Sequence, residues 1–291
     1  MSTPQLQHQE QSGSTPRTIE TADGTQLYYK DWGHGPAIVL IHGWPLSSDS
    51  WDDVALGLAN AGYRTIAYDR RGFGRSSQPW IGYDYDTLAD DLAAVIEQLA
   101  LEDVVLIGFS MGGGEVARYM SRHGGRHVSK AVLVSSVTPY MLHTDDNPEG
   151  TPASAFETMT ESMVTDRAKF FSSFFRDFYG VGPLTHPTSD AQVDASRTTA
   201  MQASLKATLA CAESFATTDF RPDMSAFTVP TLIIHGTEDK TVPIDAAARA
   251  ALRAIPSARL IEYSGAPHGI LATHKALVTK DILDFLTAAV G

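Results

Sequence analysis

The stretch Val104-Val105-Leu106-Ile107-Gly108-Phe109-Ser110-Met111-Gly112-Gly113-Gly114 decides the fold of this chain. Branched apolar residues run into a serine that has a glycine two residues away on each side, and a helix-like sequence follows. An apolar run of this kind predicts a strand buried on both faces, as in a parallel sheet. The chain must then turn sharply into the helix, and this turn would lift Ser110 above the edge of the sheet. Glycine suits the two flanking positions because a side chain there would collide with the turn.

Short Gly-x-Ser-x-Gly matches also arise by chance, so the motif needs support from partners elsewhere in the chain. An alcohol is a poor nucleophile at neutral pH. Ser110 therefore needs a base, and the base needs an orienting carboxylate. After a strand-turn-helix serine, these partners follow in the order acid, then histidine, each on a loop at the carboxyl edge of the sheet.

Strands and helices alternate on both sides of this stretch, which predicts a parallel sheet covered by helices on both faces. Ser50 is expected to cap one helix and Gly62 to end it. Besides the strand before Ser110, strands are predicted over residues 17–21, 26–32, 36–42, 63–68, 130–135, 230–236 and 259–263. Besides the helix that follows Ser110 to about residue 123, helices are predicted over residues 51–61, 85–101, 245–254 and 275–290.

The alternation stops between residues 138 and 226, where only helices are predicted, over 155–178 and 190–217. The first of them is dense in phenylalanine and methionine. Most of these side chains are expected to attach an inserted helical cap to the sheet, and a minority to face a pocket. The predicted organisation is a disordered tail over 1–16, a sheet domain over 17–137 and 227–291, and a cap over 138–226.

Composition excludes several classes of protein. The formal net charge is −12 and no cluster of lysine or arginine occurs, so nucleic-acid binding is not expected. No apolar run approaches the ~18 residues of a membrane span, and the polar residues 1–16 do not resemble a secretory signal. The single cysteine, Cys211, permits no intrachain disulfide. We predict a cytoplasmic protein with a small-molecule substrate. The sequence leaves open whether the protein forms a homo-oligomer.

Two loops offer the partners of Ser110 in the required order. Asp239 follows the strand over 230–236, and His268 follows the last predicted strand. Both loops leave the carboxyl edge of the sheet, so the side chains can meet Ser110 there. The neighbouring Glu238 could be the acid instead, and Asp145 or Asp146 is a weaker option.

The remaining histidines are interpreted as structural or as surface residues. His42 and His235 stand at the ends of buried strands, where a structural role is expected. Surface or helix-end positions are expected for His123, His127, His143 and His274.

An oxyanion needs two backbone N–H donors. Met111, directly after the serine, would supply one. Trp44 would supply the other from the loop after the strand over 36–42, since the next residue, Pro45, has no N–H. Trp44 could also serve only in packing, which is compatible with a role of its backbone.

Neither a metal nor a cofactor is predicted. The segment over 143–147 is interpreted as a solvated turn, and the glycine run at Gly112 lacks the lysine of a phosphate-binding loop. Asp69-Arg70-Arg71 is interpreted as an internally paired turn that braces the floor of the pocket.

These motifs together resemble the α/β-hydrolase superfamily, and within it the cofactor-free bacterial haloperoxidase, aryl esterase and perhydrolase group. The resemblance is carried by His42-Gly43-Trp44-Pro45-Leu46-Ser47, Tyr68-Asp69-Arg70-Arg71-Gly72-Phe73-Gly74-Arg75-Ser76, the Ser110 segment and His235-Gly236-Thr237-Glu238-Asp239. It implies a triad of Ser110, Asp239 and His268, and so places the acid at Asp239 rather than Glu238. It also implies an oxyanion hole made by Trp44 and Met111.

The resemblance further implies hydrolysis of small esters through an acyl-enzyme. Hydrogen peroxide could replace water in the second step, which gives a secondary perhydrolase or haloperoxidase activity without haem or metal. A lactam or lactone hydrolase with the same triad is an alternative, and so is a cofactor-free lyase or oxygenase, or a ligand receptor without enzymatic activity. Dehalogenase and epoxide-hydrolase chemistry is disfavoured, because those relatives carry a carboxylate where Ser110 stands.

Overall fold

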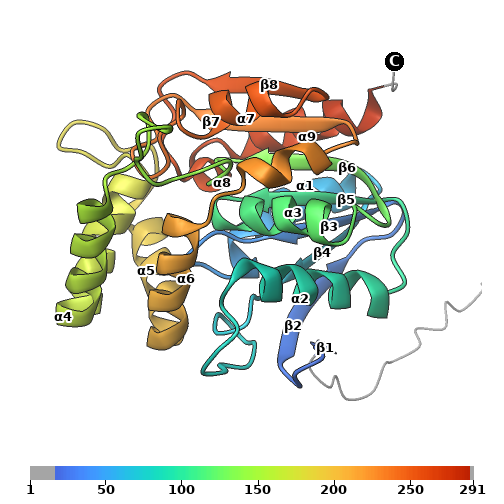
Figure 1. The fold of residues 1–291 in the computed structure, drawn as a ribbon, viewed down its shortest axis with the longest axis horizontal. Coiled ribbons are helices and arrows are strands. Elements are labelled where there is room, and N and C mark those ends of the chain that lie inside the picture. Colours follow the sequence, from blue (N-terminus) through green and yellow to red (C-terminus); the bar gives the residue numbers. More distant parts are fainter. Residues whose placement is uncertain (1–16, 289–291) are drawn as a thin grey trace, which may run out of the picture.

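A computed structural model describes residues 17–288, and the predicted tail over 1–16 lies outside them. Within the described residues, eight strands form one sheet in the order β1-β2-β4-β3-β5-β6-β7-β8 (Figure 1). β3 to β8 are parallel, while β2 is antiparallel to β1 and β4. The predicted, mostly parallel sheet is confirmed. The strands are β1 Thr18–Glu20, β2 Gln26–Trp32, β3 Ala37–Ile41, β4 Arg64–Tyr68, β5 Val104–Phe109, β6 Val128–Val134, β7 Thr231–Gly236 and β8 Ala258–Tyr263.

Helices cover both faces of the sheet. α1 packs against α9, and α2 packs against α3 on the face nearer the viewer in Figure 1. The helices of the two faces together are α1 Asp52–Asn60, α2 Tyr85–Gln98, α3 Met111–Arg122, α7 Ala248–Ala254, α8 Ile270–Thr273 and α9 Lys275–Thr287. A 3₁₀ turn, η1 (Ser48–Trp51), precedes α1. The prediction that Ser50 caps this helix is wrong, because Ser47 Oγ accepts the hydrogen bond from the Asp49 N–H at the start of η1.

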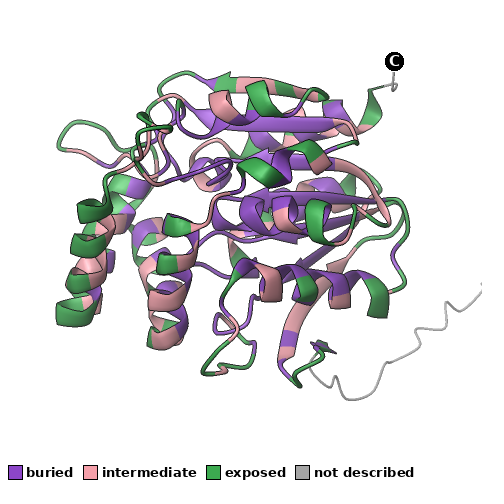
Figure 2. Ribbon diagram, in the orientation of Figure 1, coloured by how far each residue is buried: buried purple, intermediate pink, exposed green. Residues whose placement is uncertain are grey.

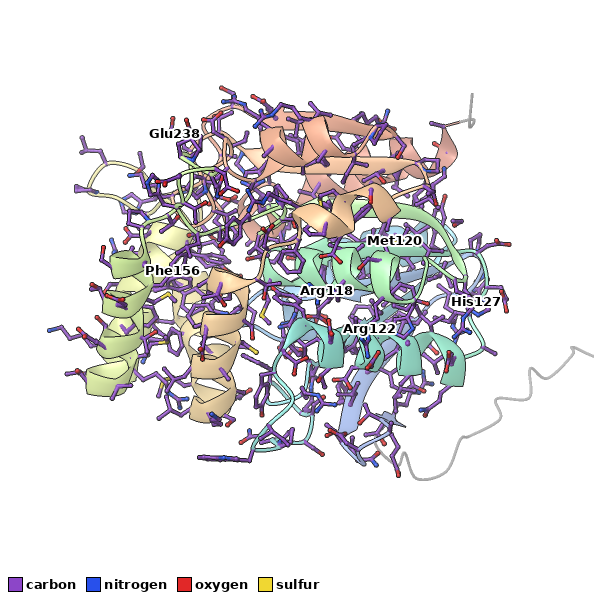
Figure 3. All side chains as sticks on the ribbon, viewed as in Figure 1. Arg118, Met120, Arg122, His127, Phe156 and Glu238 are labelled. Atoms are coloured by element: carbon purple, nitrogen blue, oxygen red, sulfur yellow. The ribbon has the colours of Figure 1, made fainter. Side chains whose placement is uncertain are left out.

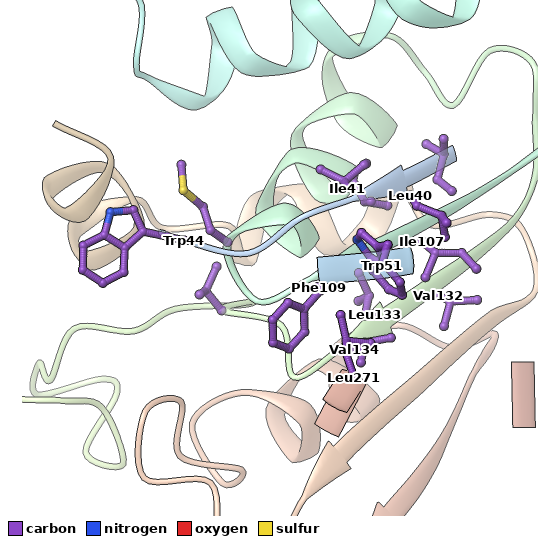
Figure 4. Close-up of a cluster of buried hydrophobic side chains, with 14 of the residues drawn as sticks. Leu40, Ile41, Trp44, Trp51, Ile107, Phe109, Val132, Leu133, Val134 and Leu271 are labelled. Carbon is purple, nitrogen blue, oxygen red and sulfur yellow. The ribbon is translucent and has the colours of Figure 1, made fainter. Parts of the chain in front are cut away.

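The central strands are apolar because both of their faces are buried. All six residues of β5 are buried, and the inner strands are buried along most of their length in Figure 2. Figure 4 shows Ile41, Ile107 and Val132 from adjacent strands packed beside Trp51, which is fully buried. This rigid layer fixes the ends of the strands, and therefore the loops that follow them.

Between β6 and β7 the described chain forms helices and turns, with only two isolated bridges, Leu142–Thr151 and Thr144–Asn147. The helices of this segment, which we call the cap, are α4 Ala153–Phe178, α5 Asp190–Gln202, α6 Leu205–Thr217 and the 3₁₀ helix η2 Arg221–Ala226. The single helix predicted over 190–217 is two helices. The backbone is extended at Ala203, and Ser204 Oγ accepts from the Ala207 N–H to start α6.

Across residues 17–288, no helix combines the length and the apolar character needed to cross a membrane.

Candidate active site

Ser110 occupies a strained turn between β5 and α3. Its φ is 53° and its ψ is −119°, a region that residues with a side chain rarely adopt. A Cβ at Gly108 would lie 2.4 Å from the Gly112 carbonyl oxygen, so a side chain there collides with the turn as predicted. A Cβ at Gly112 would instead lie 2.4 Å from the carbonyl oxygen of Ile41, at the end of β3. The two glycines thus let the turn close and let α3 approach the neighbouring strand.

The three predicted triad side chains lie in one hydrogen-bonded row. His268 Nε2 is 3.0 Å from Ser110 Oγ, and His268 Nδ1 is 2.6 Å from Asp239 Oδ2. The exposed fractions are 5% for Ser110, 6% for Asp239 and 0% for His268. With the hydroxyl donating to Nε2 and the Nδ1–H donating to the carboxylate, the row can carry a proton away from the serine oxygen.

Asp239 is held as a carboxylate by several donors. Oδ1 accepts the backbone N–H groups of Thr241 (2.9 Å) and Val242 (2.8 Å), while Oδ2 accepts from His268. Burial opposes ionisation of this group, but the charge of His268 and the hydrogen bonds of the two neighbouring histidines outweigh it. The pKa of Asp239 therefore lies below its usual range.

The second of these histidines is His235, which the sequence suggested only as a structural residue. Its Nε2 lies 2.9 Å from the Val242 carbonyl oxygen and 3.2 Å from Asp239 Oδ2. Both neighbours are acceptors, so Nε2 carries a hydrogen, while Nδ1 has no partner within residues 17–288. His235 thus donates to the same carboxylate oxygen as His268. Its position four residues before the acid was the signal that could have revealed this contact.

The alternative acids lie elsewhere. Glu238 is exposed, and Figure 3 shows it at the periphery of the molecule. Asp145 and Asp146 lie on an exposed turn, where Asp146 pairs with Arg221 at 2.9 Å. The imidazole of His268 therefore bonds to Asp239 and to none of these three carboxylates.

Two backbone donors beside Ser110 are available to an oxyanion. Among the described residues, the N–H groups of Trp44 and Met111 donate to no protein acceptor. The Trp44 indole N–H donates to the Thr208 carbonyl oxygen in α6 at 3.0 Å, and Figure 4 shows the ring pointing away from the core of the sheet. Trp44 therefore packs against the cap through its side chain while its backbone N–H stays free.

A buried network lies under the loop that carries Trp44. Arg70 Nη2 donates to the His42 carbonyl oxygen at 2.6 Å, and the Arg70 guanidinium forms an ion pair with Glu115 of α3. Tyr68 donates its hydroxyl to the other oxygen of Glu115 at 2.5 Å. Arg70 and Glu115 are at most 1% exposed. The network thus ties the end of β3, where the loop that carries Trp44 begins, to the helix that follows Ser110.

The prediction of an internally paired turn is right only for Asp69, which pairs with Arg75 of the same loop at 2.9 Å. Arg70 reaches α3, and Arg71 reaches Asp91 of α2 at 2.6 Å. Arg71 also pairs with Asp23, in the turn between β1 and β2, at 2.8 Å. The turn is therefore braced from outside.

His42 is a neutral structural residue, as expected. Its Nε2 accepts the backbone N–H of Arg70 at 3.0 Å, so the ring hydrogen is on Nδ1, which is 2.9 Å from the Gly43 carbonyl oxygen. Burial, and then the positive charge of Arg70, lower the pKa of His42 to about 3.

A small apolar cavity of about 60 Å³ lies above Ser110. Of the aromatic and methionine side chains in α4, only Phe156, Met159 and Phe174 line it, as the predicted minority. Phe178 instead packs edge-on to the His268 ring, with 4.8 Å between centroids. The complete lining is Trp44, Ser110, Val137, Met141, Phe156, Met159, Phe174, Phe215, Thr241 and Val242.

The other histidines take part in local contacts. His123 lies 2.9 Å from Asp90 and His127 lies 2.6 Å from Glu102. In the part of the chain that the structure describes, no group of three or more His, Cys, Asp or Glu side chains is arranged to hold a metal ion.

Comparison with known proteins agrees with this geometry. Residues 36–275 match the family described as the alpha/beta hydrolase fold. The chain belongs to the α/β-hydrolase family. The predicted family and fold are thereby confirmed.

Several relatives within this family are similar along nearly their whole length. A non-heme chloroperoxidase of Kitasatospora aureofaciens is 41% identical, over 91% of this chain and 98% of the relative. A bifunctional esterase/perhydrolase of Acinetobacter calcoaceticus is 39% identical, over 92% and 98%. The crystal structure of a bromoperoxidase from Bacillus anthracis superimposes with a TM-score of 0.91 at 43% identity, covering 94% of this chain and all (100%) of that one. This α/β hydrolase is thus similar to the haloperoxidase and esterase group that the motifs suggested.

Proposed function

We propose that this α/β hydrolase cleaves small esters through an acyl-enzyme on Ser110, with His268 as base and Asp239 as the orienting acid. One observation carries the proposal: the row from the Ser110 hydroxyl through His268 to Asp239, with distances of 3.0 and 2.6 Å. The names of the relatives, an esterase/perhydrolase and non-heme chloroperoxidases, support the same reaction class.

In the first half of the reaction, Ser110 Oγ bonds to the ester carbonyl carbon while its proton passes to His268 Nε2. The carbonyl oxygen becomes an oxyanion, which the free N–H groups of Trp44 and Met111 would stabilise. Asp239 stays ionised and stabilises the imidazolium. When the ester C–O bond breaks, the leaving alcohol takes the proton from His268 and the acyl group remains on Ser110.

In the second half, water loses a proton to His268 and attacks the acyl carbon, which releases a carboxylic acid and restores Ser110. Hydrogen peroxide can attack in the same way and release a peracid. The peracid then oxidises a halide ion to hypohalous acid and is itself reduced to the carboxylic acid. The oxidising equivalents come from peroxide, which accounts for a secondary haloperoxidase activity.

The size of the cavity favours short acyl groups. On the measure by which one water needs about 10–15 Å³, the roughly 60 Å³ above Ser110 would hold about four to six waters. The lining is mostly apolar, so an acetyl or butyryl group would fit it better than a polar acyl group.

The test is Ser110→Ala assayed on 4-nitrophenyl acetate. The wild-type enzyme should release a burst of nitrophenol and should gain the mass of a fluorophosphonate adduct, and the variant should do neither. Acetate, hydrogen peroxide and bromide together should support bromination of an added acceptor by the wild type alone. Undiminished ester turnover by the variant, or a wild type without any serine adduct, would rule out the acyl-enzyme and favour proton-abstraction chemistry.

A further inference from the structure

A groove of about 490 Å³ lies between the first half of α4 and α6. Its floor is apolar, with Leu209, Ala212 and Ala216 of α6 among its lining residues. Its rim carries the carboxylates of Glu157, Glu161 and Glu213, all of which are exposed.

The groove and the cavity above Ser110 share one residue, Phe156. Its half-buried ring packs edge-on to Phe215, with 6.3 Å between centroids, and Phe215 lines the cavity as well. Figure 3 shows Phe156 between α4 and α6. A shift of this one side chain would join the groove to the cavity that contains the nucleophile.

The half of α4 that carries Phe156 is loosely held. The α4 backbone leaves helical geometry at Asp166, where φ is −157° and ψ is 86°, so residues 153–165 form a separate helical segment. In this segment only Met163 is fully buried, whereas the second half buries Phe171, Phe175 and Phe178. Few buried apolar contacts mean a low cost of local opening.

We propose that this groove is the entrance through which esters reach Ser110, with Phe156 as its gate, and that its carboxylates select neutral or cationic esters over anionic ones. The inference rests on the proposed ester hydrolysis and adds to it the class of substrate and the route.

The charge at the rim carries the selectivity. Within residues 17–288, Glu157, Glu161 and Glu213 form no ion pair, and the one cation that lines the groove, Lys206, places its ammonium 5.2 Å from the ring of Trp80. An anionic ester in the groove would meet three carboxylates and one ammonium, so the excess of negative charge repels it. Physiological salt, with a Debye length of about 8 Å, screens repulsion over shorter distances only partly. The carboxylate formed by hydrolysis would feel the same repulsion, which favours its departure.

A second cavity, of about 290 Å³, lies between η1, α5 and α8, but Ser110 does not line it. Phe109 and Phe178 line its wall, and both rings pack against His268, with centroids 5.2 and 4.8 Å away. Entry through the second cavity would require Phe109 and Phe178 to move away from the catalytic imidazole. Entry through the groove requires only Phe156 to move, and Phe156 does not touch that imidazole.

The first arm of the test concerns the gate. Phe156→Trp should lower kcat/KM for 4-nitrophenyl octanoate at least fivefold more than for 4-nitrophenyl acetate, and Phe156→Ala should raise the ratio of octanoate to acetate rates. Val164→Trp, an exposed change on the same helix, and Thr199→Trp, in the second cavity, should leave this ratio unchanged. A ratio that responds to Thr199→Trp and not to Phe156→Trp would overturn the route.

The second arm concerns charge, with the matched esters 4-nitrophenyl butyrate and mono(4-nitrophenyl) succinate. The triple variant Glu157→Gln, Glu161→Gln, Glu213→Gln should raise kcat/KM for the succinate about three- to tenfold and leave the butyrate within twofold, and high salt should abolish the difference.

A control variant removes three carboxylates away from the groove: Glu97→Gln, Glu102→Gln and Asp177→Asn. It should leave the preference between the two esters unchanged. Equal responses of the groove and control variants would show that overall charge sets the preference, and would overturn the selectivity. If acetate hydrolysis depends on Ser110, but neither the octanoate-to-acetate ratio nor the preference between butyrate and succinate responds to the groove variants, the entrance alone is rejected. If acetate hydrolysis does not depend on Ser110, the proposed function itself is rejected.

Discussion

Replacing Glu115 by leucine should separate the stability of the buried network from its effect on catalysis. The change leaves the Arg70 guanidinium, 1% exposed, without its carboxylate. Breaking a buried pair from one side costs about 3–5 kcal/mol. At roughly 2–4 °C per kcal/mol for large domains, Tm should fall by roughly 6–20 °C. Leucine also removes the acceptor of the Tyr68 hydroxyl, which adds to the loss.

The double variant Arg70→Met, Glu115→Leu removes both charges and should recover much of this stability, because apolar replacements of buried ion pairs are often neutral or stabilising. It still leaves the Tyr68 hydroxyl and the His42 carbonyl oxygen without partners, at about 1–3 kcal/mol each. Activity should not recover with stability. Without the Arg70 guanidinium, the His42 carbonyl oxygen loses its donor at the start of the loop that carries Trp44. If this loop supplies an oxyanion donor as proposed, kcat should stay at least about tenfold low while KM changes little.

The assay combines urea unfolding, followed by tryptophan fluorescence, with kcat and KM on 4-nitrophenyl acetate. Glu97→Leu is the control, because its exposed ion pair with Arg126 should contribute at most about 1 kcal/mol. A double variant no more stable than Glu115→Leu would refute the account of the pair. Full activity in the double variant would refute the role of Arg70 in positioning the loop.

Further outcomes are expected at three residues: Gly112, Cys211 and His235. Gly112→Ala places a Cβ 2.4 Å from the Ile41 carbonyl oxygen, so it should lower the free energy of unfolding in urea by about 1–3 kcal/mol and lower kcat as well. The control Gly62→Ala has open space around its Cβ and should leave kcat unchanged. Burial raises the pKa of Cys211 to about 12, so the thiol should resist alkylation at pH 9 until urea unfolds the protein. This folded-state pKa lies above the ordinary ~8.5, so the thiol's contribution to the free energy of unfolding is complete below pH ~8.5. Above that pH the contribution should fall by up to about 1.4 kcal/mol per pH unit. Cys211→Ala should lack this part of the pH dependence. His235→Leu removes one donor to Asp239, so the pKa of Asp239 should rise but stay far below 7. Activity at pH 7 should therefore fall much less than the roughly 10⁴-fold loss caused by a triad Asp→Asn change in a serine protease. A loss as large as that would contradict this prediction.

The positions of residues that directly follow a strand could be predicted well from the sequence. Carboxyl ends of parallel strands meet at one edge, so residues that follow β5, β7 and β8 had to come near one another. This is why Ser110, Asp239 and His268 could be chosen from residues far apart in the chain. The choice between Glu238 and Asp239 had a different basis. Adjacent residues point in different directions, and only the resemblance, not the local pattern, favoured the one that turned out to be buried.

Contacts between elements left no such signal. The partner of Arg70 lies on α3, 45 residues along the chain, and nothing in the local sequence distinguishes Glu115 from a solvated helical glutamate. Similarly, the periodicity over 190–217 continues through Ala203, so the division into α5 and α6 depends on a single extended residue and the Ser204 cap. Such features follow from which surfaces face each other after folding.

The entrance groove could not be predicted from the spacing of residues in α4. The aromatic side chains of α4 recur with helical spacing whether they attach the cap or line a pocket, so spacing alone cannot tell Phe156 from Phe171. What separates them is the break at Asp166, because it lets the two halves of α4 follow different directions. The second half then buries its rings against the fold, while the first half presents Phe156 and a row of carboxylates to α6. If Asp166, whose side chain accepts the Lys169 N–H, maintains this break, then Asp166→Ala should favour a continuous helix and change the ratio of octanoate to acetate rates without changing the burst at Ser110. An unchanged ratio would mean that packing against α5 and α6, and not the local cap, sets the direction of the first half.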